Sequence, residues 1–182
     1  MRIINFFYIL GKMLTLPGAY LKGYWEHLTC RINKIPVETK GYLHLDETCG
    51  HVEHDVAPTV WKKYLVATAP GFANAALGFF MAIGGVVGLY YLGVNASNSL
   101  PMFIFYVVTS YLGVSMLCNV APMIETALFL WDGIYGKGSK NVFAKIFLFI
   151  PTVITVAWAY LERYSVTVLA NIAIVLLLVF TA

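Results

Sequence analysis

The chain has 182 residues, of which 60% are apolar and 12% are charged, and its mean hydropathy is +0.76. A soluble domain carries about 25% charged residues, whereas 61 consecutive residues between Lys63 and Glu125 contain no acidic, basic or histidine side chain. The net charge of +3 is small and dispersed, which argues against a nucleic-acid partner. We therefore predict an all-α, multi-pass membrane protein with a single integral membrane domain in the lipid bilayer.

The N-terminal third divides into an apolar helix and a polar loop. Residues 3–31 are mostly apolar and predict one long helix that spans the membrane or associates with it. Pro17-Gly18 should kink or break this helix near its middle. Residues 32–64 hold many of the charges together with two prolines, so we expect a loop or short strands there.

Four later segments are long and apolar enough to cross a bilayer, which takes about 20 residues per helix. They are 65–94, 101–121, 141–160 and 166–181. A short amphipathic helix near 123–133 should lie in the interface. Lysine and arginine concentrate in 31–63 and 137–145, and excess positive charge marks the cytoplasmic side. The loops 32–64 and 122–140 are therefore expected to be cytoplasmic.

Small residues recur along the first of these four segments. Small side chains at helical spacing let helix backbones approach closely in lipid. We predict that this face packs against another helix through Gly78, Ala82, Gly84 and Gly88.

All four histidines lie within 28 residues, and two of the three cysteines lie among them. Imidazole and thiolate are the ligands that zinc prefers, although the spacing here matches no standard zinc finger or protease pattern. The candidate ligands are His27, Cys30, His51 and His54. The alternative is an interfacial loop whose polar side chains face headgroups and water.

Residues 17–31, Pro-Gly-Ala-Tyr-Leu-Lys-Gly-Tyr-Trp-Glu-His-Leu-Thr-Cys-Arg, resemble the motif helix of site-2-protease-type membrane zinc metallopeptidases. Small relatives of that group show Pro-Gly-x-x-Leu-His-Glu-x-x-His-x-Leu-x-Cys-Arg, and a Pro-Val pair follows. Pro36-Val37 is similar to that pair. The order of these elements is the same in both.

Further elements extend the resemblance to about residues 17–131. Gly50–Asp55 is similar to the group's Gly-Tyr-Val-x-His-Glu, and Ala69–Asn74 to its Gly-Pro-x-x-x-Asn. Tyr111–Ser115, followed by Ala121–Ala127, resembles its Ala-Phe-Pro-Ser-x-x-Asp-Ala element.

The resemblance also shows which chemistry this chain lacks. It implies that Lys22 and Glu26 stand where the group has its two zinc histidines, Gly23 where it has the general base, and Thr126 where it has the third ligand. A His-Glu-x-x-His helix works because two imidazoles face one zinc ion and the glutamate activates its water. Lys22 and Glu26 are four residues apart, so we expect them to form an ion pair in the vacated site.

These observations lead to three functional hypotheses. The first is a non-catalytic scaffold or assembly subunit, without a cofactor, that binds a partner membrane protein or a second copy of itself. The second is a metal-dependent membrane enzyme with relocated histidine and cysteine ligands, which would bind zinc. The third is a small pore or carrier.

Overall fold

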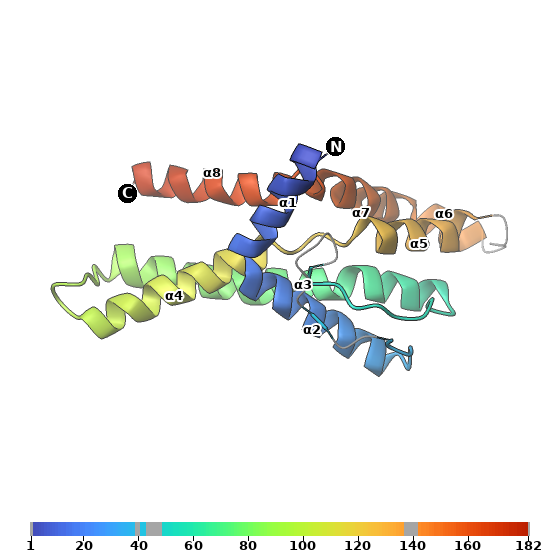
Figure 1. Ribbon diagram of the computed structural model, residues 1–182, viewed down its shortest axis with the longest axis horizontal. Helices are drawn as coiled ribbons and strands as arrows, with labels where there is room; N and C mark the ends of the chain where they lie inside the picture. The colour runs from blue at the N-terminus through green and yellow to red at the C-terminus, as the bar shows by residue number, and fades with distance from the viewer. Residues whose placement is uncertain (1, 39–40, 43–48, 137–141, 182) are drawn as a thin grey trace.

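The computed structural model describes residues 2–38, 41–42, 49–136 and 142–181, with the backbone alone for 2–7, 144 and 178–181. Helices account for most of this part of the chain (Figure 1). They are α1 (Arg2–Leu14), α2 (Leu16–Ile32), α3 (Val60–Val86), the π-helical turn η1 (Val87–Tyr91), α4 (Leu100–Leu117), α5 (Ile124–Tyr135), α6 (Val142–Phe147), α7 (Phe149–Glu162) and α8 (Val166–Thr181).

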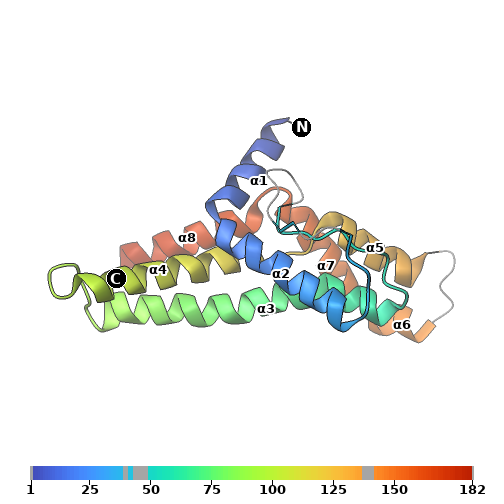
Figure 2. The same cartoon turned by 60° about the horizontal axis from the view of Figure 1, so that its bottom comes forward.

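The antiparallel hairpin of α3 and α4 forms the long axis of the molecule (Figures 1 and 2). Small residues let the two helices touch along this hairpin. A Cβ atom on Gly113 would lie 2.3 Å from the backbone nitrogen of Ala82, and one on Gly88 would lie 2.2 Å from the ring of Tyr106. Gly78 also faces α4, because its Cβ would lie 2.8 Å from the Cβ of Met116.

Gly84 does not belong to this contact, contrary to our expectation. A Cβ atom on Gly84 would meet nothing within 4 Å, whereas one on Gly85 would lie 2.0 Å from the hydroxyl of Ser110. Gly85 follows Gly78 by seven residues, close to two full turns of an α-helix. Gly84 is rotated by about 100° from that line and points away from α4.

Among the residues that the structure describes, two helices are long and apolar enough to cross a membrane. They are Val60–Tyr91, with 32 residues, and Leu100–Leu117, with 18. A third crossing would combine α7 with the part of α8 up to Leu177, a pair bent by 78°. The helices expected at 65–94 and 101–121 are therefore long and apolar enough to span a membrane, whereas those expected at 141–160 and 166–181 would together supply at most one bent crossing. Residues 141–160 do not form one helix, because the chain breaks at Leu148 between α6 and α7.

The predicted N-terminal helix is also divided. The break falls at Thr15, two residues before Pro17, because proline is tolerated in the first turn of a helix. From this break α1 rises steeply from the molecule, and α2 crosses α3 and α4 (Figure 2). The crossing is close, since a Cβ atom on Gly18 would lie 2.0 Å from the carbonyl oxygen of Ser115.

The polar segment after α2 folds back along the molecule. Its described residues have loop character, with one isolated antiparallel bridge between Val37 and His54. Around this bridge the amide of Glu38 donates to the carbonyl of Glu53 at 2.9 Å. Gly50, with φ of +79°, lies directly on α2, because a Cβ atom there would be 2.6 Å from the carbonyl oxygen of Ala19.

Two small apolar clusters surround the N-terminal half of α3. The first joins α2, the polar segment and α3 through Cys30, Ile35, Ala57 and Val66. The second joins α3 to α5 through Ala67, Leu130 and Ile134. α5 also packs against α7, and α8 runs beside α4 (Figure 2). Apolar contacts therefore hold α2 and α5 against the N-terminal half of α3.

The close contact in the hairpin predicts different effects for the same substitution at two glycines. Gly113→Ala should lower the free energy of unfolding by about 1–3 kcal/mol, because the added methyl group overpacks the contact with α3. Gly84→Ala is the matched control and should leave stability unchanged or slightly raised. The thermal unfolding midpoint in mild detergent measures both. Equal effects of the two substitutions would contradict the packing described here.

Candidate functional site

Helices α2, α3 and α4 meet at a buried polar crossing near the middle of α3. Asn74 is fully buried, and its side-chain nitrogen donates to the carbonyl of Gly18 at 2.9 Å and to that of Asn119 at 3.1 Å. The amide of Gly18 donates to the hydroxyl of Ser115 at 2.8 Å. Backbone groups at the crossing thus have side-chain partners, as buried polar groups require.

A buried ion pair adds α1 and α7 to this crossing. The ammonium of Lys12 donates to Glu162 Oε1 at 3.1 Å and to Asn119 Oδ1 at 2.8 Å. Both charged side chains are 4% exposed. The nitrogen of Asn119 in turn donates to the carbonyls of Thr15 and Ser115, at 3.1 and 2.9 Å. A buried charge is tolerated only when it is paired in this way.

Sequence reasoning missed this ion pair. Its one usable signal was an isolated charge in each of two apolar helices, since such a charge is costly unless it has a partner. The residues are 150 positions apart, so no local pattern connects them.

Lys22, which the resemblance aligns with the first zinc ligand, is also buried. Its ammonium donates to the carbonyl oxygen of Ala121 at 2.5 Å. Burial, together with the nearby charge of Lys12, lowers the pKa of Lys22 from 10.5 to about 8. The side chain therefore still carries its proton at neutral pH. It has no lone pair to offer a metal ion in this state.

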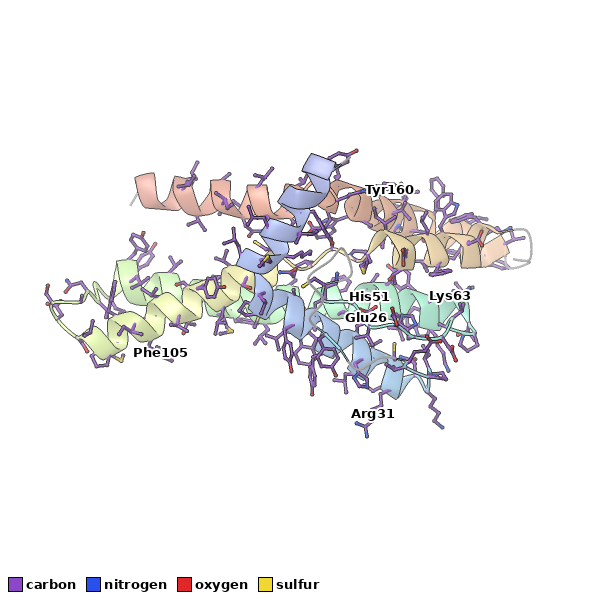
Figure 3. The ribbon with its side chains drawn as sticks, viewed as in Figure 1. Glu26, Arg31, His51, Lys63, Phe105 and Tyr160 are labelled. Atoms are coloured by element: carbon purple, nitrogen blue, oxygen red, sulfur yellow. The ribbon has the colours of Figure 1, made fainter. Side chains whose placement is uncertain are left out.

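The expected ion pair between Lys22 and Glu26 is not formed. Glu26 Oε1 lies instead 2.9 Å from His51 Nδ1 and 3.7 Å from His54 Nε2. Figure 3 shows Glu26 and His51 side by side. The pair of Lys22 and Glu26 does not form because the polar segment folds back onto α2. It brings the imidazoles of His51 and His54 to the carboxylate of Glu26.

These contacts shift the pKa of both kinds of group. Burial alone would raise the pKa of Glu26, but the hydrogen bond from His51 and the proximity of His54 outweigh it, so the pKa lies below 4.5. The proximity of the Glu26 carboxylate raises the pKa of His54 above 6.5, although burial opposes this. The cluster therefore favours a carboxylate facing a protonated imidazole.

The three residues that the resemblance aligns with zinc ligands line one small cavity. Lys22, Glu26 and Thr126 surround it together with Pro70 and Pro122, and its volume is about 10 Å³. A space of that size holds about one water molecule. Gly23 lies elsewhere, packed against Tyr42 and Gly50.

The proposed relocated zinc ligands are not brought to one point. His51 and His54 are neighbours, with ring centroids 5.9 Å apart, but His27 lies 2.5 Å from the hydroxyl of Tyr42. Cys30 belongs to the apolar cluster on α2, where burial raises the pKa of its thiol to about 12. Within the described ranges, no group of three or more His, Cys, Asp or Glu side chains is arranged to hold a metal ion.

Comparisons with family models, with curated proteins and with solved structures find no match to this chain. The interpretation of the site therefore rests on its own residues. Those residues form a polar interior in which each ammonium has an oxygen partner within the chain.

The cluster around Glu26 predicts a pH-dependent stability with a definite sign. Because the pKa of His54 is raised by folding, its contribution is full below pH 6.5 and is lost as the pH rises through the folded value. Because the pKa of Glu26 is lowered, its contribution is full above pH 4.5 and is lost as the pH falls through the folded value. The cluster should therefore stabilise the fold most between these two pH values.

The unfolding midpoint, followed from about pH 5 to pH 7.5, tests this expectation, because the lowered pKa of Lys22, about 8, makes stability rise with pH above that range. Wild type should lose stability as His54 deprotonates, and His54→Gln should lose less over the same range. His27→Gln is the matched control, because His27 contacts Tyr42 rather than Glu26, and it should keep the wild-type dependence. The same pH dependence in all three proteins would show that the cluster does not act in this way.

Proposed function

We propose that this chain is a non-catalytic membrane subunit, a scaffold that binds a partner membrane protein or a second copy of itself. In this proposal the helices keep a peptidase-like arrangement that has lost its zinc ligands. The observation that carries the proposal is the buried ammonium of Lys22 beside Glu26 and Thr126, in a cavity of about 10 Å³.

The chemistry of these residues argues against hydrolysis at this position. A catalytic zinc ion needs lone-pair ligands and one open position for water. Lys22 is protonated and donates to Ala121, and Gly23 has no side chain to act as a base. Glu26 already accepts from His51. The groups that metal chemistry would need are thus missing or engaged.

The size of the cavity argues against a substrate in the interior. Pockets that bind small molecules usually measure about 300–1,000 Å³, far more than the space at Lys22. The charges that a carrier would offer to an ion are engaged within the chain, as in the pair of Lys12 and Glu162. A role that needs no polar binding site in the interior therefore fits best. Binding of another protein through the outer surface is such a role.

The outer surface has the character that this role requires. Large apolar side chains point away from the hairpin, with Phe80 on α3 73% exposed and Phe105 on α4 60% exposed (Figure 3). In a bilayer these side chains contact lipid or the helices of another protein. Packing of helix surfaces is what drives association of membrane proteins.

Native mass spectrometry of the protein extracted in mild detergent tests the proposal. We expect a stoichiometric second polypeptide, either a different membrane protein or a second copy of this chain. Extraction in a denaturing detergent is the control and should release the chain alone. A monomer under every mild condition, carrying only lipid, would overturn the scaffold proposal.

A further inference from the structure

A second, much larger cavity lies between α3 and α7. Its volume is about 270 Å³, and its walls include Tyr64, Phe72 and Ala75 of α3 and Ile154 and Trp158 of α7. α5 contacts both helices and joins them on one side. The cavity is thus separate from the polar interior around Lys22.

The walls of this cavity present carbon atoms rather than polar groups. The hydroxyl of Thr68 donates to the carbonyl of Tyr64 at 2.8 Å, and that of Thr155 donates to the carbonyl of Pro151 at 2.7 Å. The indole nitrogen of Trp158 donates to the hydroxyl of Thr167 at 3.2 Å. Because these polar atoms are engaged within their own helix or helix pair, the cavity favours an apolar occupant.

The volume of the cavity limits which apolar groups can enter it. A protein cavity of about 150 Å³ holds one benzene molecule, so 270 Å³ has room for a longer hydrocarbon segment. One turn of an α-helix with its side chains fills at least about 400 Å³, given its diameter and pitch. A helix from another protein is therefore too thick to enter, whereas an acyl chain is thin enough to place part of its length there.

Aromatic side chains lie at one end of this cavity, and two lysines are next to them in the sequence. At its Tyr64 end, Trp61 stacks on Tyr64 with ring centroids 6.2 Å apart, and Trp61 is 61% exposed. Lys62 and Lys63 adjoin these rings in the sequence, although they do not line the cavity: the ammonium of Lys62 donates to the carbonyl of Asn33 at 2.7 Å, and Lys63 lies beside Gly133. Aromatic rings and basic side chains are typical of the membrane interface, and lysines there attract anionic headgroups. Ala75 lies further along the same candidate span.

We propose that the cavity between α3 and α7 binds part of one acyl chain of an anionic phospholipid drawn from the bilayer. The chain lies along Phe72 and Ala75 toward Trp158, and the phosphate lies at the basic end near Tyr64. This site is independent of the scaffold proposal, because it requires neither a protein partner nor a vacated zinc site.

Retention of lipid by two neighbouring variants tests this site. Ala75→Phe places a ring in the cavity, whereas Ala76→Phe places the same ring on an exposed position of the same helix. Each protein is placed in bilayers of equal phosphatidylglycerol and phosphatidylcholine and transferred to detergent, and its bound lipid is measured by mass spectrometry. Wild type and Ala76→Phe should retain a single lipid, enriched in phosphatidylglycerol. Ala75→Phe should weaken retention about tenfold.

Fluorescence of Trp158 gives a second readout that does not depend on survival of the complex in detergent. In a variant with Phe at Trp25, Trp61 and Trp131, phosphatidylglycerol with brominated acyl chains should quench Trp158 strongly. Adding Ala75→Phe should reduce this quenching, and adding Ala76→Phe should not. Equal retention and equal quenching in the two variants would overturn the proposal, as would retained lipid without preference for phosphatidylglycerol.

Discussion

An ammonium group buried in an apolar chain must find oxygen partners, and this requirement positions α1, α2 and α7 around the middle of α3. Lys12 on α1 binds Glu162 at the end of α7 and Asn119 after α4. Lys22 on α2 binds the carbonyl of Ala121. Removing one partner of such a pair leaves a buried charge uncompensated, which costs about 3–5 kcal/mol. The α3–α4 hairpin supplies the frame, and these polar contacts decide how the other helices join it.

The same contacts determine what the interior can do. The polar centre leaves a cavity of only about 10 Å³, with Glu26 facing His51 and Lys22 facing a backbone carbonyl. The larger space lies to one side, between α3 and α7, and its walls are apolar. This arrangement supports the proposals that the chain binds lipid and other membrane proteins.

The sequence predicted the helical class, the hairpin of 65–94 and 101–121, and the short helix near 123–133, because long apolar runs and breaker residues are local signals. It did not predict the break at Leu148 or the phase of the helix contact, where Gly85 rather than Gly84 meets α4. It also missed the partners of Lys12 and Glu26. Those contacts depend on packing between segments distant in the sequence, which no spacing rule shows.

We propose that Lys22, Glu26 and Thr126 occupy a vacated metal site, and zinc content tests this proposal most directly. In the variant Lys22→His/Glu26→His/Thr126→Asp, two imidazoles and a carboxylate would line one cavity, a ligand set that suits zinc. We predict about one zinc ion per chain in this variant by elemental mass spectrometry. The two-histidine variant that keeps Thr126 should bind much less, and wild type none. Stoichiometric zinc in wild type, or a folded triple variant without zinc, would contradict the account.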